Sequence, residues 1–182
     1  MVKYPEVQDK VHEEIQRQVG SSRPVYMEDK LALPYTQAVL QEIMRFTCIG
    51  PLALPHAAQA DIQLEGGKYL IPKGTCIFPN LYRITRNARV FTNPTKFMPE
   101  RFLSPDGKYV KNDQEVTFGV GKRDCLGKSL ALTEFFLFFA NLMQRFHFTS
   151  VFTDLDLINL EPRMGLTQTP HPFEVVIEKK LQ

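Results

Sequence analysis

A run of nine residues, FFLFFANLM at positions 135–143, most constrains what this chain can fold into. It lies in a predicted helix over residues 126–146 and places apolar side chains on every side of that helix. A small domain cannot leave such a helix on its surface, so we expect it to be buried all round. The other elements of a chain of 182 residues are too few to wrap it. We therefore expect the chain to be part of a larger protein, with oligomerisation as the alternative.

Two further helices are predicted upstream of this run. In residues 5–19 an apolar residue recurs at every fourth position, Pro5 suits the first helical position and Gly20 suits the stop. A second helix opens at Pro34, presents apolar residues to a core and ends before Gly50. Both patterns indicate amphipathic helices.

Short strands are predicted between and after the helices. Prolines punctuate residues 51–117 and separate segments that are typical of brief strands, namely DIQLEG, KYLIP and TCIFP. FHFTSVF and PFEVVIEKK, which follow the long helix, predict two closing strands. The expected fold class is mainly α with small β-sheets (α+β), in one domain whose hydrophobic fraction of 43% suffices for a core.

Charge and cysteine usage exclude several classes of protein. The 22 basic and 20 acidic residues give a net charge of +2 and no basic block, so no nucleic-acid partner is expected. The three cysteines, Cys48, Cys76 and Cys125, form no CxxC pair, which argues against a disulfide scaffold, a zinc ribbon or a four-cysteine cluster. No signal peptide is expected, and no run approaches the ~18 apolar residues that a membrane span needs.

The loop GVGKRDCLGKS invites two chemical interpretations. A phosphate-binding loop would need glycine at the position that Lys122 occupies, so the spacing argues against it. The alternative makes Cys125 a metal ligand, because a predicted helix N-terminus and the nearby Lys122 and Arg123 stabilise a thiolate. A nucleophilic Cys125 would need a paired histidine, and neither His56 nor His147 carries a signature for that role. Cys48 and Cys76 are interpreted as buried structural cysteines.

The decapeptide FGVGKRDCLG, residues 118–127, resembles the cysteine signature of the cytochrome P450 family. The resemblance covers essentially the whole chain and implies that Cys125 is the axial ligand of haem b (iron protoporphyrin IX). It also implies that Arg123 pairs with a haem propionate. The five matching positions, all expected at the cofactor, are Phe118, Gly121, Arg123, Cys125 and Gly127.

The resemblance extends to a second pair of motifs. EIMR, residues 42–45, is similar to the Glu-x-x-Arg of the family, and PERF, residues 99–102, is similar to its partner segment. It implies that Glu42, Arg45 and Arg101 form a charged network that supports the cysteine loop.

Two further segments resemble parts of the family that face the haem. PLALPHAAQAD, residues 51–61, is similar to the chain that crosses one haem face in animal microsomal members, which implies that His56 contacts a propionate. GLTQTP, residues 165–170, is similar to the last hairpin turn that reaches the active site. The resemblance implies substrate contacts from both segments: Ala53, Leu54, Leu166 and Thr167.

The implied activity is that of a haem-thiolate monooxygenase, which uses electrons from NADPH to insert one atom of dioxygen into a small lipophilic substrate. The implied partner is NADPH-cytochrome reductase, with cytochrome b5 as a second electron donor, and Lys122, Arg123 and Lys128 are expected near the reductase face. The implied location is the cytosolic face of the endoplasmic reticulum membrane.

The chain departs from the family in length. It lacks the Ala/Gly-Gly-x-Asp/Glu-Thr motif of the oxygen-activating helix and the N-terminal membrane anchor. We therefore expect residues 1–182 to be the C-terminal portion of a single domain, with no catalytic residue beyond the axial ligand and no turnover alone. The alternative is a non-catalytic remnant that binds haem partially or binds another protein through its apolar helix.

Overall fold

The computed structural model describes residues 1–112, 114 and 116–180. Its secondary structure is mainly helical, with small two-stranded sheets, as the sequence predicted. The helices are α1 (Pro5–Gln18), α2 (Pro34–Thr47), α3 (Leu81–Thr85) and α4 (Lys128–Arg145). Short 3₁₀ turns are η1 (Met27–Ala32), η2 (Glu65–Gly67), η3 (Pro99–Phe102), η4 (Gly121–Arg123) and η5 (Leu155–Leu157).

Three antiparallel strand pairs complete the described fold. The last pair, β5 (Phe146–Ser150) with β6 (Val175–Lys179), forms where FHFTSVF and PFEVVIEKK predicted closing strands. The other two pairs are β1 (His56–Ala57) with β4 (Cys76–Ile77), and β2 (Ile62–Leu64) with β3 (Tyr69–Ile71).

The main core lies where α1, α2 and α4 meet. The four-residue spacing on α1 buries Val7, Val11 and Ile15 against the apolar side of α4. The fully buried Gln8 then ties α1 to β5, because its side-chain amide donates to the Phe148 carbonyl at 2.9 Å and accepts from the Phe148 N–H at 2.8 Å. Hydrogen bonds of this kind fix the register of packed elements that apolar contacts alone leave free to slide.

The long helix α4 is covered on one side only. Phe136 and Met143 are buried in the core, but Phe138 is 69% exposed and Leu142 is 44% exposed. The described chain therefore leaves this helix partly uncovered, in agreement with the expectation that its other elements are too few to wrap it. The physical reason is that α1 and α2 pack against one stripe of α4 and leave the opposite stripe without a neighbour.

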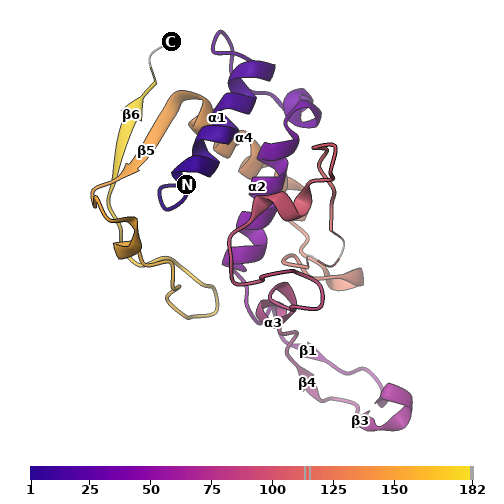
Figure 1. Cartoon of the computed structure of the whole chain (residues 1–182). Helices are drawn as coiled ribbons and strands as arrows, with labels where there is room; N and C mark the ends of the chain where they lie inside the picture. The colour runs from indigo at the N-terminus through magenta and orange to yellow at the C-terminus, as the bar shows by residue number, and fades with distance from the viewer. Residues whose placement is uncertain (113, 115, 181–182) are drawn as a thin grey trace.

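The strands β1 to β4 form an arm that projects from the helical body (Figure 1). Every residue of β2 is exposed, because each sheet of the arm has two strands and no layer packs on its faces. Cys76 in β4 is exposed as well, so the prediction that it is a buried structural cysteine is wrong. Cys48, at the left-handed C-terminal cap of α2, is buried as predicted.

Candidate cofactor site

An ion network on α2 is the most completely bonded part of the site. The side chains of Glu42 and Arg45 are both fully buried. The Arg45 guanidinium grips the Glu42 carboxylate with two bonds, Nε to Oε2 at 2.7 Å and Nη2 to Oε1 at 2.8 Å. Its remaining N–H groups donate to the carbonyls of Thr85, Pro94 and Lys96. All five donors of the guanidinium therefore have acceptors, which buried charge requires.

Arg101 joins the same carboxylate from η3. Its Nε lies 3.2 and 3.3 Å from the two Glu42 oxygens, and the Met98 N–H donates to Glu42 Oε1 at 2.7 Å. Its other nitrogens donate to the carbonyls of Thr92, Asn93 and Lys96. One carboxylate thus holds two guanidinium groups, and together they fasten residues 85–101 to the face of α2.

Arg86 is a further member of this region that sequence reasoning missed. Its Nη2 donates to the carbonyl of Phe46 at 2.6 Å, so it caps the last turn of α2, whose carbonyls have no partner inside the helix. Its guanidinium carbon lies 3.7 Å from the centroid of the Tyr82 ring. Burial lowers the pKa of Arg86 below its ordinary value. No local pattern marks such a residue, because its hydrogen-bond acceptor, the Phe46 carbonyl, lies 40 residues earlier in the sequence.

The cysteine loop has a different character. The Cys125 N–H donates to the Phe118 carbonyl at 2.8 Å, which closes the loop, and the Lys128 N–H donates to the Cys125 carbonyl at 3.2 Å, which joins it to α4. The Cys125 side chain is exposed. Leu126 beside it is fully exposed, so an apolar surface adjoins the thiol. The loop holds a soft ligand where a molecule from outside can reach it.

Glycines shape this loop, but not all those the sequence indicated. Gly121 has a φ of +75°, a conformation that glycine adopts at little cost. Gly119, which sequence reasoning did not single out, has a φ of +78°. Gly127 has a φ of −86° as the N-cap of α4, so any residue fits its backbone. The positive φ values of the loop thus fall at Gly119 and Gly121, which form its turn.

Positive charge surrounds the thiol. Lys122 and Arg123 lie in η4 and are exposed. This turn ends at Arg123, two residues before Cys125. Phe118 is half-buried and packs beneath the Lys128 ammonium, 6.0 Å from the ring centroid. Cations and the positive end of the α4 dipole attract carboxylates to this side of the loop.

The two segments expected to contact substrate lie together. The backbone N–H of the buried Gln168 donates to the Ile49 carbonyl at 2.7 Å, which ties the turn at 165–170 to the chain that leaves α2. Leu166 and Thr167 are exposed in that turn. The chain after Ile49 carries the other expected contacts, the exposed Leu54 and the half-buried Ala53, whose φ of 51° is left-handed. His56 follows in β1, paired with Ile77 of β4.

The described residues contain neither a cluster of metal ligands nor a membrane-spanning helix. Across residues 1–112, 114 and 116–180, no group of three or more His, Cys, Asp and Glu side chains is placed to hold a metal ion by itself. Within the same ranges, no helix has the length and apolar character needed to cross a membrane.

Comparison with known proteins identifies the family. Residues 1–177 match the family description "Cytochrome P450". The chain is 43% identical over 176 residues to human cytochrome P450 2U1, covering 97% of this chain and 32% of that protein. It is 42% identical to cytochrome P450 2C23 of rat, covering 97% and 35%, and 42% identical to cytochrome P450 2K6 of zebrafish, covering 99% and 35%.

The chain thus spans about a third of the length of the curated relatives it matches. The match includes α1 and runs as far as residue 177, within β6. This chain belongs to the cytochrome P450 family.

Proposed function

We propose that residues 1–182 are the C-terminal portion of a single cytochrome P450 domain and that Cys125 is the axial ligand of haem b. The observation that carries the proposal is an exposed thiol at the cysteine of the family signature, on a loop closed by the bond from Cys125 N–H to the Phe118 carbonyl. Family membership implies haem.

The residues present fit a flat, largely apolar macrocycle with two carboxylates. Gly121 and Gly127 have no neighbour within 4 Å of where a Cβ would lie, so a ring can approach the backbone there. The fully exposed Leu126 supplies apolar surface beside the sulfur. Arg123 in η4 and His56 in β1 supply the donors that propionates need.

Each residue has a distinct task in this proposal. Cys125 donates its thiolate to the iron, while Arg123 and His56 hold the propionates and so set the orientation of the ring. Phe118 keeps water from one side of the sulfur. Glu42, Arg45 and Arg101 touch neither haem nor substrate; they support the residues from which the loop departs. Ala53, Leu54, Leu166 and Thr167 meet the substrate.

A haem-thiolate centre activates dioxygen and inserts one oxygen atom into a small lipophilic substrate, with electrons from NADPH. For the longer protein we propose NADPH-cytochrome reductase as partner, with cytochrome b5 as a second donor, near Lys122, Arg123 and Lys128. We also propose the endoplasmic reticulum membrane, on its cytosolic face, as its location. For the 182-residue chain alone we expect no turnover, because the Ala/Gly-Gly-x-Asp/Glu-Thr motif is absent from its sequence.

Haem titration of the chain tests the proposal. The expected result is one haem per chain, with an absorption change that Cys125→Ala abolishes. Cys76→Ala is the matched control, since Cys76 is the other exposed cysteine. Equal haem binding by the chain and by Cys125→Ala would overturn the assignment of the ligand.

The exposed stripe of α4 favours a second candidate function. Leu130, Phe138 and Leu142 lie on that stripe and are 63%, 69% and 44% exposed. A remnant that binds another protein through this stripe would need no haem. Absence of haem binding by a folded chain, measured in the same titration, would favour this alternative.

A further inference from the structure

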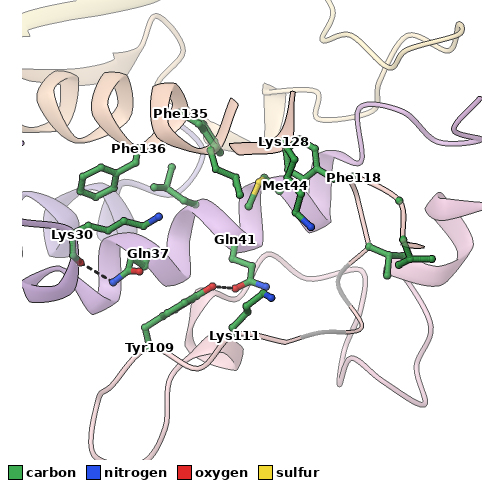
Figure 2. A pocket seen from close by; sticks show the side chains of 15 residues that line it. Lys30, Gln37, Gln41, Met44, Tyr109, Lys111, Phe118, Lys128, Phe135 and Phe136 are labelled. Atoms are coloured by element: carbon green, nitrogen blue, oxygen red, sulfur yellow. Dashed lines mark hydrogen bonds between the residues drawn. The ribbon is translucent and has the colours of Figure 1, made fainter. Parts of the chain in front are cut away.

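A cavity of about 270 Å³ lies between α2, α4 and the residues that lead into the cysteine loop. Its apolar wall includes Met44 of α2, Phe118 of the loop, and Leu132 and Phe135 of α4 (Figure 2). A volume of this size approaches the lower end of those seen for small-molecule sites, about 300 Å³. Neither the axial thiol nor any residue proposed to meet substrate lines it.

A largely buried glutamine lines this cavity, and the donor end of its side-chain amide has no acceptor among the described residues. Gln41 is 4% exposed, and its Oε1 accepts a hydrogen bond from the Tyr109 hydroxyl (Figure 2). Because that bond orients the amide, Nε2 is left as the free end, and none of the described residues accepts from it. Because Gln41 lines the cavity, its Nε2 can donate to a molecule bound there, so the site favours a ligand with an acceptor oxygen.

A cation at the same cavity also has no acidic partner. The Lys128 ammonium lies 6.0 Å from the centroid of the Phe118 ring, and no carboxylate of the described residues pairs with it. Lys128 is also the first residue of α4, where the helix dipole is positive and no side chain caps the N-terminus. Lys30 lies at the opposite end of the cavity, over the Phe136 ring at 5.6 Å (Figure 2).

We propose that this cavity binds a small amphipathic carboxylate, such as a medium-chain fatty acid. The carboxylate accepts from Gln41 Nε2 and the Lys128 ammonium, and the alkyl chain lies along Met44, Phe118 and Phe135. An ionised carboxylate satisfies both donors at once, whereas a neutral ligand leaves the ammonium unpaired. Since the Phe118 carbonyl accepts from the Cys125 N–H and Phe118 lines the cavity, a ligand here contacts the cysteine loop at a residue bonded to Cys125.

The proposal does not depend on haem binding, so its test needs none. The probe is sodium octanoate, titrated into the 182-residue chain labelled with ¹³C at its methionine methyl groups, of which there are six. Met44 lines the cavity, Met164 adjoins the turn at 165–170 and is 73% exposed, and Met143 is buried in the core. The expected result is a saturable shift of the Met44 signal, with Met164 unmoved and a dispersed Met143 signal that reports an intact fold.

Two comparisons make the test specific. Lys128→Ala is expected to weaken octanoate binding about tenfold, the worth of one charge-assisted hydrogen bond, whereas Lys122→Ala in η4, outside the cavity, leaves it unchanged. Octan-1-ol, which has the same chain without the charge, is expected to bind about tenfold more weakly. An unmoved Met44 signal, a shift of Met164 instead, or equal affinity for octanoate in Lys128→Ala would each overturn the proposal.

Discussion

The α2 network and the cysteine loop are both charged parts of one site, yet they are built in opposite ways. In the network the Glu42 and Arg45 side chains are fully buried, and every donor of Arg45 has an acceptor. In the loop Arg123 and Cys125 are exposed, and a backbone bond from the Cys125 N–H to the Phe118 carbonyl closes it. The network is complete within this chain, while the loop directs its side chains outward. Support and chemistry are thus assigned to separate residues.

This difference teaches where each kind of substitution acts. A change in the network leaves a charge buried without its partner, which raises the free energy of the folded state. A change at an exposed loop side chain removes little from the fold, because water already solvates that side chain. We therefore expect stability and haem ligation to respond to different residues.

The largest expected effect is that of Glu42→Gln. This change leaves two guanidinium groups sharing an uncharged amide, so we expect the free energy of unfolding to fall by about 3–5 kcal/mol. Chemical denaturation followed by circular dichroism measures it. The matched control is Glu65→Gln, which breaks another i,i+3 pair, with Lys68, whose side chains are both 64% exposed. There we expect a loss of about 0–1 kcal/mol. Equal losses in the two variants would contradict the contrast drawn here.

A smaller loss is expected from Arg45→Lys. Lysine keeps the charge beside Glu42 but cannot make the paired bonds of the guanidinium. It also loses the hydrogen bonds to the carbonyls of Thr85 and Pro94. We expect a loss of about 1.5–3 kcal/mol in the same denaturation experiment. Arg101→Lys is the comparison, and it should cost less, because the Arg101 bonds to Glu42 are longer, at 3.2 and 3.3 Å. The opposite order would show that the network is centred on η3 and not on α2.

Two glycines of the loop allow the effect of backbone conformation to be distinguished from the effect of space for a side chain. Neither would place a Cβ within 4 Å of a neighbour, but only Gly121 has a positive φ. We expect Gly121→Ala to cost about 1–2 kcal/mol and to weaken haem binding, whereas Gly127→Ala leaves the loop conformation intact. Denaturation and haem titration of both variants provide the measurement. If Gly127→Ala proves the more harmful to stability, our account of the turn is wrong.

The smallest expected effect on stability is that of Cys125→Ala. The Cys125 residue is exposed, so the free energy of unfolding of the haem-free chain should change by no more than about 0.5 kcal/mol. Cys48→Ala is the informative contrast, because Cys48 is buried at the end of α2 and its loss leaves a small cavity. A large loss on Cys125→Ala would mean that the loop cysteine also supports the fold.

Sequence reasoning predicted the elements whose signals are local. The spacing of apolar residues with Pro5 and Pro34 located α1 and α2 almost to the residue, and motif order led to Glu42 and Arg45. It missed what depends on distant partners. Arg86 caps α2 from another element, and the backbone carbonyls that receive Arg45 come from segments about 40 to 50 residues away.

The error at Cys76 has a physical cause. The prediction that Cys76 is buried rests on residue type, since lone cysteines are usually inside. Burial depends on what packs against a residue, and Cys76 lies in the two-stranded pair of β1 and β4 with its side chain exposed. Sequence reasoning did not identify Gly119 as a turn residue, because the conformation of the whole loop decides which glycine adopts a positive φ.

The central claim is that Cys125 supplies the ligand to iron while the α2 network supplies only support. The most direct measurement is the absorption spectrum of the reduced carbon monoxide complex of the haem-loaded protein, recorded for the unchanged chain, Cys125→Ala and Glu42→Asp. We expect the thiolate-type spectrum in the unchanged chain, the same spectrum at lower haem-bound yield in Glu42→Asp, and its loss in Cys125→Ala. A thiolate-type spectrum that survives in Cys125→Ala would contradict the account.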